Sequence, residues 1–292
     1  MYAFIKNYSD TFRVGKMCKV LKLSRSGYYA WLHRKVSLRV KRSEKLKIEI
    51  KRIFDWSKKR YGSPRITIEL NSQGIKTSKP LVAKLMQELG LKSIVKKKFK
   101  ITTDSEHKFT IAKNHLNREF ITARPNQVWV SDITYLRSKE GWSYLTTVID
   151  LYDRKVIGWA LSNRMHAEQT VIPASKRAKI NRPLLNHEQL VFHSEKGVQY
   201  ACDAFRNELK KSKDIIQSMS RKGNCRDNAV AESFFKTLKT ELIYHNKYQT
   251  RNELELTVFE YIETWYNKKR RHSHLMNLTI FENEQLNIKN AA

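Results

Sequence analysis

The chain has 292 residues and is 40% hydrophobic, so it is long enough for two or three domains with ordinary cores. Its 57 lysines and arginines outnumber 28 aspartates and glutamates, and the net charge of +29 indicates nucleic acid or another anionic surface as a partner. Three widely separated cysteines exclude a disulfide framework and a cysteine-based zinc site, and no apolar run reaches membrane-spanning length. We therefore expect a soluble, intracellular protein with no membrane contact.

The positive charge is concentrated in residues 1–120, which carry +21, whereas the remainder of the chain carries only +8. Within residues 1–40, Val14 and Leu21 keep helical spacing, and Ser24 can cap a second short helix. Two short helices joined by a tight turn are typical of a helix-turn-helix that binds DNA. A helical hairpin with only a packing role would show the same pattern.

Residues 41–95 predict a second helix-turn-helix-like, DNA-binding domain, with a stronger signal. A basic helix opens the segment, Pro64 suits the first turn of the next helix, and Ser78 can cap a third helix. Lys79 and Lys84 would then face outward, as on a recognition helix that contacts DNA. The alternative is a helical spacer with a solvated basic face.

Residues 96–121 begin with KKKFK and continue as a polar, weakly periodic stretch, which predicts a basic linker between domains. Lys96, Lys97 and Lys98 can neutralise DNA phosphates without reading the sequence of bases. A run of solvated charges without a partner is the competing interpretation.

Between residues 122 and 286 the pattern becomes α/β. The stretch NQVWVSDITYL alternates as a β-strand around Asp132, and two further strands, TTVIDLY and VIGWAL, follow it. Glu195 lies at the end of a short apolar strand in LVFHSEKGVQY, and Glu232 lies on a helix that comes after the strand IIQSM. This order predicts a mixed five-stranded sheet with flanking helices, followed by an amphipathic C-terminal helix.

The three acids in this region suggest a metal site. A charge such as Asp132 in the middle of a strand is costly unless it is paired or binds a metal. Two strand carboxylates and one on a helix provide the oxygen ligands that a two-metal phosphoryl-transfer site needs. Glu232 shares its helix with Lys236 and Lys239, which can meet a DNA phosphate. Alternatively, Glu232 merely complements the positive end of that helix.

Other polar residues near these acids have simpler interpretations. Asp150 and Asp153 are possible rival ligands, but they flank a turn between strands, where aspartate is a common residue. His193 precedes the strand glutamate by two residues, so it either lines the site or belongs to the core. Asp227 or Asn228 is expected to cap the helix that carries the third acid.

Five stretches of the chain, in order, resemble the transposases of bacterial insertion sequences with a retroviral-integrase-like core. More narrowly, they resemble the product of the second reading frame (OrfB) in the family that joins two overlapping frames by translational frameshifting. The stretches that carry the resemblance are NQVWVSDITYL, GWSYLTTVIDLYDRKVIGWALS, FHSEKGVQY, SMSRKGNCRDNAVAESFFKTLKTEL and YNKKRRHSHL.

The resemblance implies an RNase H-like core and a DDE triad at Asp132, Glu195 and Glu232 that holds two Mg²⁺ ions, with Mn²⁺ as a possible substitute. It implies cleavage of DNA 3′ ends and strand transfer, on double-stranded DNA from the element's terminal repeats and the target. It also implies a homo-oligomer on DNA, the upstream-frame product as a fusion or partner, and action at the nucleoid in the bacterial cytoplasm. Arg270 and Arg271 are expected to form a DNA-backbone or partner surface.

Two residues depart from the family pattern. Glu195 replaces the aspartate that the family has as its second acid, and Arg226 replaces a residue that is usually tryptophan. The first departure bears directly on catalysis, and the second lies in the loop that leads to the helix of Glu232. An alternative function is therefore a catalytically decayed, non-enzymatic DNA-binding protein or a regulator of transposition.

Overall fold

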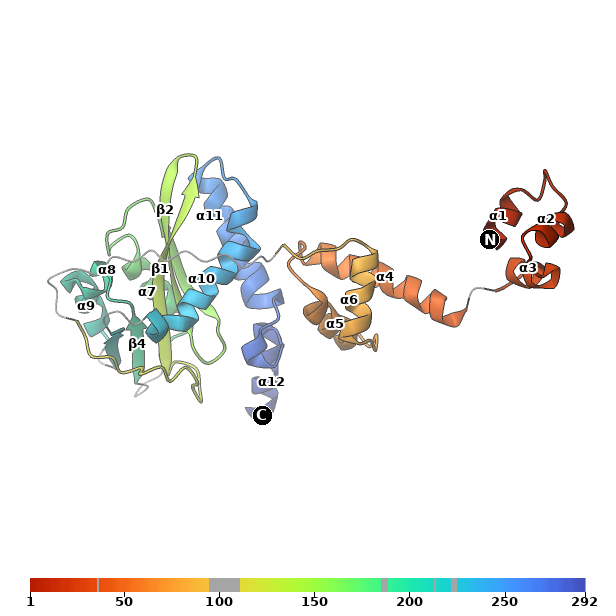
Figure 1. Ribbon diagram of the computed structural model, residues 1–292. Coiled ribbons are helices and arrows are strands. Elements are labelled where there is room, and N and C mark those ends of the chain that lie inside the picture. Colours follow the sequence, from red (N-terminus) through yellow and green to blue (C-terminus); the bar gives the residue numbers. More distant parts are fainter. Residues whose placement is uncertain (36, 95–110, 185–188, 213, 222–224, 292) are drawn as a thin grey trace.

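The computed structural model describes the chain except residues 36, 95–110, 185–188, 213, 222–224 and 292. Two helical units precede an α/β domain, and the second unit lies against that domain (Figure 1). The first unit stands apart, beyond the N-terminal end of the long helix that opens the second (Figure 1). Within the described ranges, no helix is both long enough and apolar enough to cross a bilayer.

The first helical unit contains one helix more than the sequence analysis predicted. Its helices are α1 (Tyr2–Asn7), α2 (Val14–Val20) and α3 (Arg25–Leu32). A small core brings together Ile5, Cys18 and Tyr28, one residue from each helix. The Ser24 hydroxyl accepts a hydrogen bond of 3.2 Å from the backbone N–H of Gly27. It therefore caps α3 as predicted, because it satisfies an N–H that has no partner within the helix.

The second helical unit consists of α4 (Leu38–Trp56), α5 (Ser63–Ser72) and α6 (Lys79–Glu88). Pro64 and Pro80 lie in the first turns of α5 and α6, where the missing N–H of proline costs no hydrogen bond. Ser37 caps α4 by accepting a hydrogen bond of 3.3 Å from Val40. Ser78 precedes α6, but its side chain makes no capping hydrogen bond, so the predicted cap there is wrong.

The α/β domain is built on a mixed five-stranded sheet. Its strands are β1 (Val128–Ser138), β2 (Gly141–Asp150), β3 (Val156–Ser162), β4 (Leu190–Ser194) and β5 (Ile215–Met219), in the order β3-β2-β1-β4-β5. The first three strands are antiparallel to their neighbours, whereas β4 pairs parallel with both β1 and β5. The centre of the sheet is therefore β1, with an antiparallel half on one side and a parallel half on the other.

Helices cover both faces of this sheet (Figure 1). Along β1, Trp129 packs into the core formed with α7 (Val171–Asn181), α8 (Val198–Ala201) and α9 (Asp203–Lys210). Val130 packs into the core on the other face, formed with α10 (Ala229–Glu241) and α11 (Arg251–Phe259). Alternate residues enter different cores because strand side chains point to opposite faces in turn. The sheet and the helices on its two faces make three layers, which form the expected RNase H-like fold.

The predicted C-terminal amphipathic helix is observed as two successive segments. α11 continues into a wider π-helical segment η3 (Glu260–Lys269), and the chain ends with α12 (Ile280–Ala291). The remaining short turns are 3₁₀ segments, η1 (Cys225–Asn228), η2 (Ile243–His245) and η4 (Ser273–Leu275).

The second helical unit shares a hydrophobic core with these C-terminal segments. The ring of Trp265 on η3 lies 5.4 Å from the ring centroids of both Trp56 and Tyr61. The Arg60 guanidinium lies over the same indole at 4.8 Å and donates a hydrogen bond to the backbone carbonyl of Glu241. Residues widely separated in the sequence thus join the second helical unit to the α/β domain.

Candidate active site

Asp132 and Glu195 are brought side by side by the parallel pairing of β1 with β4. Ser131 of β1 pairs with Ser194, the last residue of β4. Asp132 follows Ser131 within β1, and Glu195 follows Ser194 directly after β4. Neighbouring strands lie about 4.8 Å apart, and in-register residues point to the same face. Asp132 is two residues after Val130 on β1, so both side chains project toward the face of the sheet that α10 covers.

The third acid is positioned by a hydrogen bond between α10 and β1. The Asn228 side-chain amide donates to the backbone carbonyl of Ser131 over 3.0 Å, directly beside Asp132. Glu232 follows one helical turn later and is exposed, whereas Phe235 on the same helix is buried in the core. Asn228 is the residue before α10, but its side chain does not cap the helix as predicted.

The three carboxylates interact electrostatically. Burial raises the pKa of Asp132 well above its usual value, and the charges of Glu195 and then Glu232 raise it further. Burial and the charge of Glu232 raise the pKa of Glu195, and partial shielding from water raises the pKa of Glu232, although its side chain is the most exposed of the three. Lys239 on α10 is partly buried, which lowers its pKa, and its charge opposes the rise at Asp132. Mutually repelling carboxylates of this kind favour a bound cation.

The donor set fits a hard divalent cation. All three groups offer carboxylate oxygens, which Mg²⁺ prefers. In the described parts of the chain, no three His, Cys, Asp or Glu side chains form a ready cluster around one point. Mg²⁺ is usually held by one or two carboxylates together with water and substrate phosphates rather than by a closed protein cage.

The segment that precedes α10 is fixed by the buried carboxylate of Asp227, which was one of two residues predicted to cap that helix. Asp227 accepts hydrogen bonds from Arg221 at 2.9 and 3.0 Å, from Arg118 at 2.7 Å and from Asn114 at 3.0 Å. The hydrogen bonds from Arg221 are the main reason that the pKa of Asp227 lies far below its usual value. Asp227 therefore ties the start of α10 to the segment before β1. Gly223 and Asn224, which the motif includes, lie outside the described residues.

Two buried side chains, those of Tyr200 and His193, pack next to the strands that carry Asp132 and Glu195. The hydroxyls of Tyr200 and Ser131 lie 2.8 Å apart, directly behind the strand position of Asp132. His193 contacts the hydroxyls of Ser218 at 2.8 Å and Ser220 at 3.2 Å, and burial lowers its pKa to about 4. His193 is thus a neutral core histidine that links β4 to β5. A role for Tyr200 beside the acids was not predicted from the sequence, although a buried tyrosine hydroxyl needs a polar partner.

The rival acids have structural roles. Asp150 accepts hydrogen bonds from Asn126, Trp129 and Arg182, at 2.9, 3.2 and 2.8 Å. Asp153 accepts two hydrogen bonds from the same Arg182 guanidinium, at 3.2 and 2.6 Å. Both aspartates therefore fix the turn after β2, as the simpler interpretation held.

The lysines predicted to contact DNA differ in exposure, and Lys239 is partly buried. Lys79 and Lys84 on α6 are exposed, as is Lys236 on α10. Lys96, Lys97 and Lys98 lie outside the described residues.

The prediction for Arg270 and Arg271 is wrong, because both side chains are buried in ion pairs. Arg270 Nη2 lies 3.0 Å from Glu241 Oε1, and Arg271 Nε lies 2.6 Å from Glu69 Oε2. Arg271 therefore anchors the second helical unit and Arg270 anchors the end of α10, instead of facing DNA.

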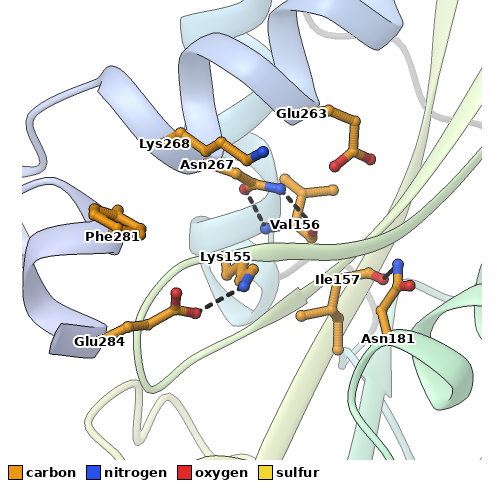
Figure 2. A pocket seen from close by; sticks show the side chains of 9 residues that line it. All are labelled: Lys155, Val156, Ile157, Asn181, Glu263, Asn267, Lys268, Phe281 and Glu284. Atoms are coloured by element: carbon orange, nitrogen blue, oxygen red, sulfur yellow. Dashed lines mark hydrogen bonds and ion pairs between the residues drawn. The ribbon is translucent and has the colours of Figure 1, made fainter. Parts of the chain in front are cut away.

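A cavity of about 280 Å³ lies beside β3, two strands away from β1 in the sheet order. Several of its polar groups pair with one another, as Figure 2 shows. Asn267 donates to and accepts from the backbone of Val156 at 2.9 and 3.0 Å, and Lys155 pairs with Glu284 at 2.7 Å. These contacts cover the edge strand β3, which protects it from pairing with another chain.

Comparison with known proteins assigns the family. The integrase core domain family matches residues 122–225, a second integrase core domain family matches residues 232–286, and an HTH-like domain family matches residues 41–99. Among solved structures, the chain resembles the simian T-cell lymphotropic virus intasome in complex with PP2A regulatory subunit B56 gamma. The identity is 14% and the TM-score 0.44, over 80% of this chain and 73% of that one.

Two curated relatives are similar over most of the chain. An uncharacterized 31 kDa protein of insertion element IS600 from Shigella sonnei is 40% identical over 263 residues, 90% of this chain and 95% of that protein. The transposase InsF of insertion sequence IS3A from Escherichia coli K12 is 39% identical over 289 residues, 98% of this chain and 99% of that protein. The chain therefore belongs to the family of insertion-sequence transposases that includes InsF of IS3.

Proposed function

We propose that this chain is the transposase that cleaves the 3′ ends of its own insertion sequence and joins them to target DNA, as a DDE-type polynucleotidyl transferase. The observation that carries the proposal is the packing of the three segments that bear the acids, together with the effect of each carboxylate on its neighbours' pKa values. The β1–β4 register supports neighbouring positions for Asp132 and Glu195, and the hydrogen bond from Asn228 to Ser131 holds the start of α10, which carries Glu232, against β1.

In this proposal Asp132, Glu195 and Glu232 hold two divalent cations, Mg²⁺ or Mn²⁺. When bound, such ions supply a Lewis acid that stabilises the attacking and leaving oxygens of phosphoryl transfer. Lys239, whose charge acts on Asp132, would contact a phosphate of the DNA beside the scissile bond. The cationic side chains of α6 would hold the DNA duplex. We further propose that the chain acts as a homo-oligomer on element ends at the nucleoid, with the upstream-frame product as a fusion or partner.

The test is the replacement of Asp132 by asparagine, with cleavage of the element's end DNA measured in Mg²⁺. The change removes a ligand charge at nearly constant shape, so cleavage should fall by at least roughly a hundredfold while DNA binding persists. Asp203→Asn is the matched control, because Asp203 is an exposed acid on α9 with a side chain that is 81% accessible. Cleavage that is as fast in Asp132→Asn as in the control would refute the proposed site.

A further inference from the structure

The hairpin of β1 and β2 extends beyond the active site. The pairing of β1 with β4 ends at Ser131 and Ser194, whereas β1 and β2 remain paired to the turn between Ser138 and Gly141 (Figure 1). The hairpin therefore presents a strip of sheet next to the acids.

One face of this strip carries aromatic rings and a guanidinium. Tyr135 is the cross-strand partner of Tyr144, with ring centroids 5.3 Å apart, and Tyr135 and Trp142 are 6.3 Å apart. Arg137, the cross-strand partner of Trp142, lies over that indole at 5.3 Å. Trp142 is 49% exposed and Tyr135 is 39% exposed. Four neighbouring side chains thus form an open aromatic and cationic surface, named here the hairpin platform.

The packing of the hairpin does not by itself account for this surface. Cross-strand aromatic pairs stabilise hairpins, but covering the rings would stabilise the fold further, because buried apolar area is favourable. Rings on an open sheet face, together with a guanidinium, are suited to stacking on nucleic-acid bases. Arg137 and the charge of +29 favour an anionic occupant over an ordinary apolar protein surface.

The hairpin platform lies close to Asp132 along the same strand. Tyr135 is three residues beyond Asp132 on the same strand, a distance of about 10 Å, and it points to the opposite face of the sheet. A single DNA strand that leaves the active site and passes around the hairpin would bring its next bases onto these rings. Duplex DNA keeps its bases stacked on one another, so the ligand has to be unpaired.

We propose that the hairpin platform, formed by Tyr135, Trp142, Tyr144 and Arg137, binds unpaired bases of single-stranded DNA next to the active site. The proposal deepens the proposed function, on which it rests, by adding a subsite for a separated strand. Stacking by Tyr135 and Trp142 is the main interaction, and Arg137 contributes charge and a planar surface.

The test compares the affinity of the full-length chain for oligothymidylate with its affinity for a duplex of the same length. Tyr135→Leu and Trp142→Leu keep an apolar side chain but remove the π surface, whereas Tyr135→Phe and Trp142→Phe retain a ring. Each leucine variant should lose single-strand affinity by roughly five- to 150-fold, the range measured for one stacked base. The phenylalanine variants should keep most of that affinity, and duplex affinity should be largely unchanged in all four.

Thermal unfolding of each variant controls for loss of the fold. A crosslinking experiment on the wild-type chain avoids the variants altogether, since an oligonucleotide with 5-iododeoxyuridine should crosslink to Tyr135 or Trp142. Crosslinks found only elsewhere, or folded leucine variants with unchanged single-strand affinity, would overturn the platform. So would leucine variants that instead lose self-association in sedimentation, since the face would then be a contact between copies. In each of these cases metal-dependent cleavage by the wild type would still support the proposed function, and its absence would count against that function separately.

Discussion

Glu195 is one methylene longer than aspartate, the residue that the resemblance implies at this position, so its carboxylate reaches about 1 Å further from the same backbone. The strand that precedes it is buried between β1 and β5 and resists a compensating shift. A displacement of about 1 Å at a reacting centre can cost around a hundredfold in rate. Mg²⁺ is sensitive to such a change because it demands near-ideal octahedral geometry.

Glu195→Asp is therefore expected to raise cleavage of end DNA, by up to roughly a hundredfold in Mg²⁺ and by less in Mn²⁺. The smaller effect in Mn²⁺ rests on the hypothesis that this ion tolerates poorer geometry. Glu232→Asp is the matched control, because it shortens a carboxylate at a position where the resemblance implies glutamate, and it should lower the rate. Equal rates for Glu195 and Glu195→Asp proteins would show that the site has adapted to the longer side chain.

At the scale of elements, one buried carboxylate joins α10 to three other segments. Glu241 at the end of α10 accepts hydrogen bonds from Arg270 at 3.0 Å, from Tyr261 at 2.9 Å and from Trp265 at 3.2 Å, and lies 3.4 Å from Arg65 of α5. Burial would raise the pKa of Glu241, but Arg270 and these hydrogen bonds outweigh burial and lower it. The side chains of Glu241 and Arg270 are only 2% and 10% accessible.

Glu241→Gln should lower the free energy of unfolding by about 3–5 kcal/mol, since it leaves Arg270 buried without its counter-charge. Denaturant unfolding measures this loss. Glu260→Gln is the control, because Glu260 pairs with Lys58 at an exposed site and should contribute at most about 1 kcal/mol. A depressed folded-state pKa stabilises the protein above the unfolded pKa of about 4.3, so the contribution of Glu241 should fade as the pH drops below that value. A loss equal to that of the control would show that the network is unimportant.

At the scale of the whole molecule, positive charge is concentrated in the part that precedes the catalytic domain. The second helical unit is attached to that domain through Arg271 and Glu69, and it leaves Lys79 and Lys84 of α6 exposed. Rigid attachment would hold these lysines at a constant position relative to the triad. DNA bound along α6 would then enter the active site in one register.

Lys79→Ala and Lys84→Ala should each weaken duplex binding and reduce the slope of log affinity against log salt concentration by about 0.9, the value for one phosphate contact. Titrations of the full-length chain at several salt concentrations give this slope. Lys58→Ala removes a lysine that pairs with Glu260 outside α6, so it should leave the slope nearly unchanged. Slopes that agree among all three variants would remove α6 from the DNA-binding surface.

The sequence by itself determined the order of the strands, the mixed sheet and the family, because local periodicity and contiguous motifs carry that information. It also singled out Asp132, Glu195 and Glu232, since an acid inside or beside an apolar strand is conspicuous. Their catalytic role stays a prediction, but their proximity follows from the β1–β4 register and from the position of α10.

Only the tertiary structure decided which charged groups are buried. Arg271 looked like part of a solvated or DNA-facing tail, but its partner Glu69 is 202 positions earlier in the chain. Asp227 looked like a helix cap, but it is held by Arg118, which is 109 positions away. No local pattern contains such pairs, because a side chain is buried by whatever the rest of the chain packs against it. The same reason hid the hairpin platform, whose rings alternate along two strands and meet only when those strands pair.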